Sequence, residues 1–222
     1  MLRVLLACLF LALPAAAQQV LYEPLPPAGS AYLRIINATP DALQVRPSVT
    51  GAATIGTENA QRISPYVVQE NVADRAVAVQ LQAGALRAEL SLRLEVGSFN
   101  TLIVTAEGGA LQARPFRDET QFNQVRARLA FYNAMGGCAQ ASLVLDPGGQ
   151  AVFENVPLAE GRMRSVNPVT AAVRATCGTQ RSQPFQLQGM EAGGVYSVWI
   201  MAPRGGTPIT FMTRDTTTPW RR

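Results

Sequence analysis

The sequence predicts an all-β fold made of two tandem β-sandwich-like domains that arose by internal duplication. Three observations predict it. Apolar and polar residues alternate with the period of a strand, turn signals recur at short intervals, and a segment near the start returns 96 positions later. No stretch of the 222 residues shows a sustained helical period with capping signals at both ends.

The strand signal is clearest in residues 86–94, where apolar and polar side chains alternate without a break. Residues 195–201 are rich in β-branched and aromatic side chains, which is typical of a central strand. Glycine and proline turns such as Thr39-Pro40-Asp41 separate these runs. We therefore expect short strands joined by turns, as in a sandwich or a small barrel.

The repeat has two parts at nearly one offset. Residues 31–38 read Ala-Tyr-Leu-Arg-Ile-Ile-Asn-Ala, and residues 127–134 read Ala-Arg-Leu-Ala-Phe-Tyr-Asn-Ala. Residues 92–118 are echoed by residues 187–215, with a Gly-Gly turn and an Arg-Asp pair in both copies. The duplication predicts two β-domains, over residues 18–118 and 124–215. A signal peptide over residues 1–17 precedes them and a short tail over residues 216–222 follows them.

The first seventeen residues are typical of an export signal. Arg3 gives a positive start, residues 4–13 are apolar, and Ala15-Ala16-Ala17 offers small residues for cleavage after Ala17. An uncleaved anchor is the alternative, but ten apolar residues are too few to span a bilayer. A lipoprotein box at residues 5–8 lies too close to the start. The prediction is a periplasmic protein.

Removal of this leader takes Cys8 away and leaves two cysteines, Cys138 and Cys177. An even pair in an exported chain predicts a disulfide. It would close a loop of about 40 residues, for which the chain-entropy model gives about 3–4 kcal/mol. A metal site needs more ligands than two cysteines, and the C-x-x-C spacing of redox sites is absent.

The chain contains no histidine, and all 19 of its basic residues are arginines. A Ser-His-Asp or Cys-His nucleophile pair therefore cannot form within it, and no Gly-x-Ser-x-Gly motif is present. A histidine-ligated metal site is excluded for the same reason. We predict no catalytic residues, no metal and no cofactor.

Two segments carry a resemblance to a known family. Residues 21–34 read Leu-Tyr-Glu-Pro-Leu-Pro-Pro-Ala-Gly-Ser-Ala-Tyr-Leu-Arg, and residues 165–169 read Ser-Val-Asn-Pro-Val. They resemble the opening and a second-half segment of the AlgF family, periplasmic accessory proteins of alginate O-acetylation. The matching positions are Leu21, Tyr22, Pro24, Gly29, Ser30, Asn167 and Pro168. Residues 49–79 show no clear correspondence, and lysine, common in the family, is absent.

The resemblance implies a non-catalytic adaptor in an exopolysaccharide O-acetylation complex that adds acetyl groups to alginate. Its implied partners are a membrane-bound O-acyltransferase and periplasmic Ser-His-Asp acetyltransferase-like proteins. Two alternatives stay open: a carbohydrate-binding β-sandwich protein that holds an acidic or cellulose-like exopolysaccharide, and an envelope scaffold. Nucleic acid is a poor partner for an exported chain of net charge +4.

Arginines are the candidate binding residues, because their planar fork matches the carboxylates of an anionic polysaccharide. Arg34 lies on the predicted outer face of its strand, and Arg162, Arg164 and Arg174 surround the Asn-Pro-Val segment. A solvated arginine face is the alternative interpretation. Trp199 is expected in the core rather than on a sugar-stacking surface.

Overall fold

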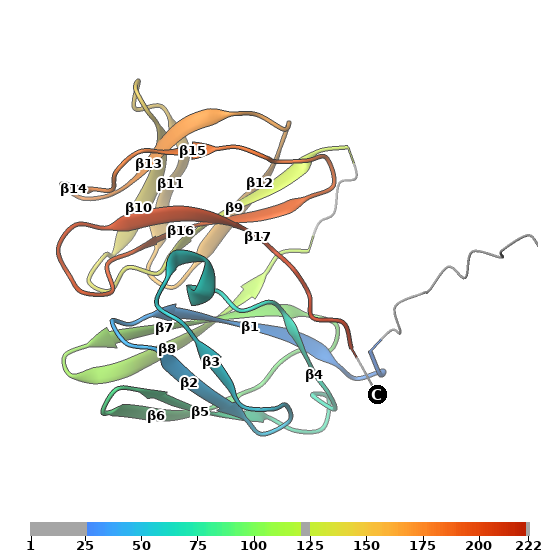
Figure 1. Cartoon of the computed structure of the whole chain (residues 1–222). Helices are drawn as coiled ribbons and strands as arrows, with labels where there is room; N and C mark the ends of the chain where they lie inside the picture. Colours follow the sequence, from blue (N-terminus) through green and yellow to red (C-terminus); the bar gives the residue numbers. More distant parts are fainter. Residues whose placement is uncertain (1–25, 121–124, 221–222) are drawn as a thin grey trace, which may run out of the picture.

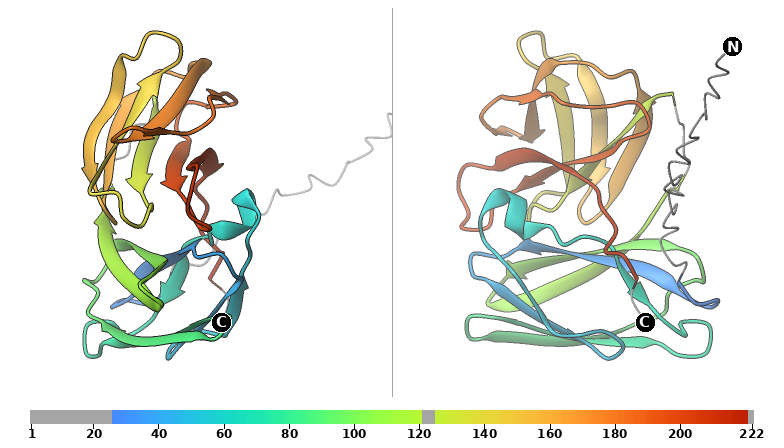
Figure 2. Two further views of the ribbon diagram at one scale, coloured as in Figure 1. Left: turned by 90° about the vertical axis from the view of Figure 1, so that its left-hand side faces the viewer. Right: turned by 45° about the vertical axis from the view of Figure 1, so that its right-hand side comes forward.

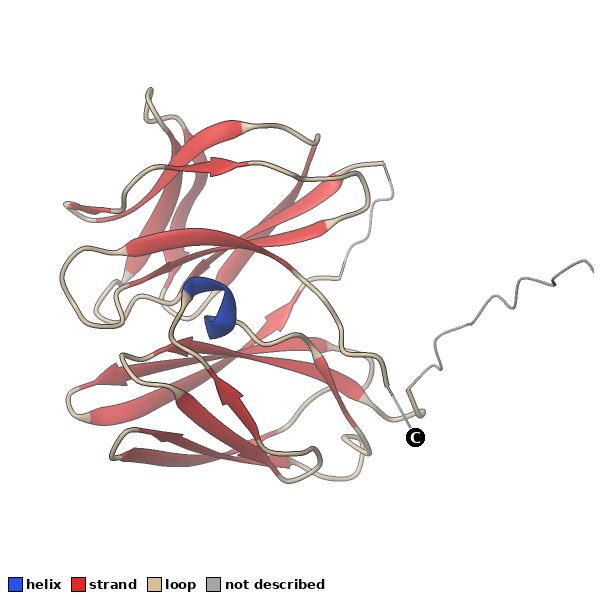
Figure 3. Cartoon of the chain, viewed as in Figure 1, coloured by secondary structure: helices blue, strands red, loops and turns tan. Residues whose placement is uncertain are grey.

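The computed structural model describes residues 26–120 and 125–220, called here the N-terminal and C-terminal halves. The predicted signal peptide, the motif residues Leu21, Tyr22 and Pro24, and residues 121–124 at the boundary between the two predicted β-domains lie outside the described residues. The described chain is almost entirely β-structure, which confirms the predicted fold class (Figure 3).

The N-terminal half forms two four-stranded sheets. Its inner sheet has the order β4-β1-β7-β8 and its outer sheet the order β3-β2-β5-β6. The strands are β1 (Ala31–Ala38), β2 (Leu43–Pro47), β3 (Ala53–Ile55), β4 (Val67–Gln69), β5 (Val77–Ala83), β6 (Leu86–Leu92), β7 (Phe99–Glu107) and β8 (Ala110–Asp118).

The C-terminal half repeats this plan. Its inner sheet has the order β12-β9-β16-β17, and its outer sheet the order β11-β10-β13-β14, with β15 also paired to β13. The strands are β9 (Ala127–Asn133), β10 (Gln140–Leu145), β11 (Ala151–Pro157), β12 (Gly161–Val166), β13 (Ala171–Cys177), β14 (Gln180–Arg181), β15 (Phe185–Leu187), β16 (Val195–Met201) and β17 (Ile209–Arg214).

The two halves share more than strand order. In each inner sheet the central pair is parallel, β1 with β7 and β9 with β16, while the flanking pairs are antiparallel. The register also agrees, since Leu33 pairs with Asn100 and, 96 positions on, Leu129 pairs with Tyr196. Such agreement is expected of a duplicated unit.

A repeated asparagine closes the same turn in both halves. The Asn37 side-chain amide donates to the backbone oxygen of Ile55, and that of Asn133 donates to the oxygen of Val156. Each side-chain oxygen accepts the backbone N–H two residues further on. Both asparagines are fully buried, so turn chemistry accounts for them.

Three apolar clusters hold the sheets together. One lies between the two sheets of the N-terminal half, and a second between those of the C-terminal half. The third lies between the two inner sheets and joins Ile36 and Ile103 to Tyr132, Trp199 and Met201. We call this contact the seam. The layers therefore run outer, inner, inner, outer, and the two halves are stacked (Figures 1 and 2).

The described helix, η1 (Asn59–Arg62), lies beside the seam near β17 (Figure 1). Its Arg62 is buried and donates to the backbone oxygens of Asn37 and Thr39, both at 2.9 Å, so that it ties the turn to the end of β1. Among the described residues no helix has the length and apolar character needed to cross a bilayer.

The predicted disulfide is present. Cys138 and Cys177 are bonded across 39 positions, with their Cα atoms 6.0 Å apart. The bond joins the turn before β10 to the end of β13, which are neighbouring strands of one outer sheet.

Residues 216–220, predicted as part of a tail, pack on the opposite half. Tyr66 forms a parallel bridge with Thr217, donating to the Thr216 oxygen and accepting from the Thr218 N–H, both at 2.8 Å. The Trp220 indole donates to a Glu70 carboxylate oxygen at 2.7 Å. Residues 216–220 therefore connect the C-terminal half to the N-terminal half by hydrogen bonds.

Candidate functional site: the seam and the outer sheets

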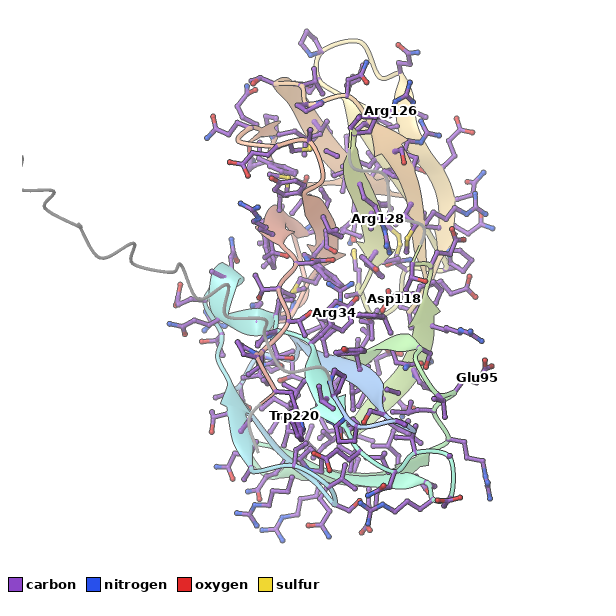
Figure 4. The ribbon with its side chains drawn as sticks, turned by 90° about the vertical axis from the view of Figure 1, so that its right-hand side faces the viewer. Arg34, Glu95, Asp118, Arg126, Arg128 and Trp220 are labelled. Carbon is purple, nitrogen blue, oxygen red and sulfur yellow. A yellow bond between two sulfur atoms is a disulfide. The ribbon has the colours of Figure 1, made fainter. Side chains whose placement is uncertain are left out.

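Arg34 is not a surface residue, so its predicted role in contacting a polymer or partner is wrong. Only 1% of it is exposed. The predicted direction of the Arg34 side chain is correct, because Leu33 and Ile35 face the core of the N-terminal half and Arg34 points away from it. That outward face is covered by the C-terminal half, and Arg34 lies in the seam (Figure 4).

One carboxylate from each half compensates the Arg34 guanidinium. Nη1 lies 2.8 Å from Asp215 Oδ1, and Nη2 lies 3.6 Å from Asp118 Oδ1. Nε donates to Thr101 Oγ1 at 2.7 Å, and Nη1 donates to Ser197 Oγ at 3.2 Å. These two hydroxyls donate in turn to Asp118 at 2.6 Å and to Asp215 at 2.8 Å.

Aromatic rings enclose the cation. The guanidinium carbon lies 4.6 Å from the ring centre of Tyr66 and 4.9 Å from those of Tyr132 and Trp199. Tyr66 and Tyr132 also donate their hydroxyls to Asp118. We call the eight residues Arg34, Tyr66, Thr101, Asp118, Tyr132, Ser197, Trp199 and Asp215 the Arg34 cluster.

The protonation states follow from this environment. Burial would lower the pKa of Arg34, but Tyr132, Asp215, Tyr66 and Asp118 outweigh it and raise that pKa above its ordinary value. Burial raises the pKa of both tyrosines above 10, against the opposing effect of Arg34. The arginine therefore stays charged and the tyrosines stay neutral hydrogen-bond donors.

Four members of the cluster occupy repeated positions, and Arg34 does not. Asp118 is the last residue of β8, Asp215 directly follows the corresponding strand β17, and Thr101 and Ser197 lie 96 positions apart. The position equivalent to Arg34 is Ala130. One arginine thus serves the matching carboxylates of both halves. The sequence shows the aspartate in both copies of the repeat but the arginine in only one. This difference could have indicated that both aspartates contact the same arginine.

The other three candidate arginines do not form one patch. Arg162 and Arg164 are exposed on β12, at the edge of an inner sheet, where Arg162 donates to the Glu154 oxygen and Arg164 covers the Phe153 ring. Arg174 lies in the outer sheet on β13 and pairs with Asp146 at 2.7 Å. Their predicted role in binding stays a prediction.

The family-motif residues that are described lie at the ends of strands. Gly29 has φ +82° just before β1, where a glycine is favoured, and Ser30 beside it is buried. Asn167 and Pro168 are exposed directly after β12. The structure therefore places the two motif segments in the N-terminal and C-terminal halves respectively.

Each outer sheet carries a polar hollow on the side away from the seam. The hollow of the N-terminal half is about 410 Å³, and that of the C-terminal half about 460 Å³. Arginine side chains line both: Arg46 and Arg87 in the first, Arg174 and Arg181 in the second. Among the described residues, no group of three or more Cys, Asp or Glu could hold a metal ion.

Fold and site together define a duplicated, disulfide-bonded β-sandwich protein with a closed seam and two polar outer faces. Part of the chain is similar to a solved structure of the C-terminal domain of AlgF from P. aeruginosa. The identity is 18%, the match covers 40% of this chain and 98% of that one, and the TM-score is 0.33. No family model matches the sequence, and no curated protein matches it.

Proposed function

We propose that this chain is a non-catalytic periplasmic accessory subunit of an exopolysaccharide O-acetylation complex, with alginate as the polymer. The observation that carries the proposal is the sequence of residues 21–34, which resembles the opening of mature AlgF proteins. The last four residues of the segment, 31–34, belong to β1, so the segment includes Arg34.

The absence of histidine supports a non-catalytic role. Acetyl transfer by a serine nucleophile needs a base to activate the hydroxyl, and in the Ser-His-Asp arrangement that base is an imidazole. This chain has none. The transfer itself is therefore assigned to the partner enzymes, and the chain acts through contacts.

The layered fold supports a bridging role. The seam buries the inner sheets against each other, so that the two outer sheets lie on the far sides of one body. A protein of this form can contact the polymer and an enzyme at once without one excluding the other. The exposed arginines of β12 add a third surface beside the seam.

Co-purification tests the proposal. A tagged copy of the chain, expressed in its own cells while polymer is being acetylated, is expected to retain the membrane-bound O-acyltransferase and a Ser-His-Asp acetyltransferase-like protein. The Arg162→Gln/Arg164→Gln variant is expected to retain less, because both side chains are exposed on one strand edge.

The matched control is Arg75→Gln/Arg126→Gln, which removes the same charge from two other exposed positions. It is expected to retain the partners as the unaltered chain does. An intact, folded chain that elutes without either enzyme from actively acetylating cells contradicts the proposal.

A further inference from the structure

The outer face of the N-terminal half presents polar side chains in cross-strand rows. The strand register places β2, β5 and β6 side by side, so that outward residues stand opposite one another. The two rows are Gln44–Gln82–Arg87 and Arg46–Gln80–Glu89, which we call the N-face.

The C-terminal half repeats this arrangement on β10, β13 and β14. The register gives the row Ser142–Thr176–Arg181 and, beside it, Val144 opposite Arg174; we call these five residues the C-face. Arg87 and Arg181 hold the same place in the repeat, each at the outer end of a row next to the hollow.

Three arginines on these faces are open to a ligand. Among the described residues, Arg46, Arg87 and Arg181 form no ion pair, and all three are exposed. Glutamine amides on the N-face and the hydroxyl of Thr176 on the C-face add donors and acceptors for sugar hydroxyls. A guanidinium binds a carboxylate through two parallel hydrogen bonds.

The geometry favours an extended polymer over a protein. Neighbouring strands are about 4.8 Å apart, close to the length of one sugar in an extended polysaccharide, so a row offers one polar side chain per sugar. In the part of the chain that the structure describes, no Phe, Tyr, Trp or Met lines either hollow. Protein interfaces usually depend on such anchors at their centre.

We propose that the N-face and the C-face are two binding sites for an acidic polysaccharide, one on each outer sheet. The choice of a polyuronate as that polysaccharide rests on the proposed function. With a site on each outer sheet, the chain holds two polymer segments at once and can present them to a bound enzyme.

Titration of the full mature chain with a short oligomannuronate tests this proposal. At low salt we expect one oligosaccharide per face, and binding that weakens as salt is added. Arg46→Gln/Arg87→Gln is expected to weaken the N-face site about tenfold and leave the C-face site unchanged. Arg181→Gln is expected to weaken the other site.

The controls separate charge at the faces from charge elsewhere. Arg75→Gln/Arg126→Gln loses the same charge as the N-face variant and is expected to bind as the unaltered chain does, and a neutral glucose oligomer of equal length is expected not to bind. Near-ultraviolet circular dichroism confirms that each variant is folded.

Three results overturn the inference: no binding by the folded chain at low salt, equal binding of the neutral oligomer, or face variants that bind like the control. If the face variants keep the sugar but lose the partner enzymes, the faces dock protein and the inference also fails. If the chain does not bind the sugar but the enzymes still co-purify, only this inference fails. If the chain binds the sugar at both faces but the enzymes do not co-purify, only the proposed function fails.

Discussion

At the scale of single residues, Arg34 decides how the two halves meet. Its guanidinium contacts Asp118 from its own half and Asp215 from the other, with aromatic rings around it. The alternation of residues 31–38 was enough to predict which way Arg34 points. It could not predict what lies on that side, because a strand pattern describes faces and says nothing about what covers them.

Replacement of Arg34 by glutamine is expected to lower the free energy of unfolding by about 3–5 kcal/mol, since two carboxylates lose their buried counter-charge. Arg34→Lys is expected to recover only part of this loss, because an ammonium lacks the planar fork that spans both carboxylates and stacks on the rings. Denaturant unfolding of the two variants beside the unaltered chain measures both effects.

The control for this experiment is Arg87→Gln, an exposed arginine of the outer sheet, which is expected to change stability by less than about 0.5 kcal/mol. A loss below about 1 kcal/mol for Arg34→Gln would show that the seam does not depend on this ion pair.

At the scale of elements, the strands with a clear sequence pattern were predictable and the connections were not. Residues 86–94 and 195–201 both contain the strands that their patterns predict, β6 and β16. Residues 49–79 showed no clear correspondence to the AlgF family, and there the chain forms β3, η1 and β4 with the connections between them. Connections tolerate insertion and change, so a resemblance between sequences is lost first where connections dominate.

The disulfide acts at this scale, because it fixes the turn before β10 to the end of β13. Cys138→Ala/Cys177→Ala is expected to lose about 3–4 kcal/mol of stability, mainly through the freedom that the unfolded chain regains over 39 positions. Denaturant unfolding measures this, with the unaltered chain under reducing conditions as a second route to the same state. Equal midpoints for the oxidised and reduced chains would contradict the expectation.

At the scale of the whole molecule, the duplication could be predicted from the sequence, but the stacking of the two halves could not. One signal pointed to it. Residues 195–201 are apolar on both faces, which is typical of a strand buried on two sides, and β16 indeed lies between its own core and the seam. Trp199 belongs to the seam side, fully buried as expected.

The polar faces were harder to foresee, because their residues come from strands that are distant in sequence. Arg46, Gln80 and Glu89 form one row only once the register of β2, β5 and β6 is known. The sequence pointed instead to Arg162, Arg164 and Arg174, which cluster along the chain but are divided between two sheets.

The acetyl content of the secreted polymer tests the central claim most directly. Cells that lack this gene, compared with the parent and with cells carrying a restored copy, are expected to secrete polymer in normal amount but with acetyl groups reduced to background. The restored copy should return them to the parental level. Polymer from the deletion cells that carries acetyl groups at the parental level would contradict the account.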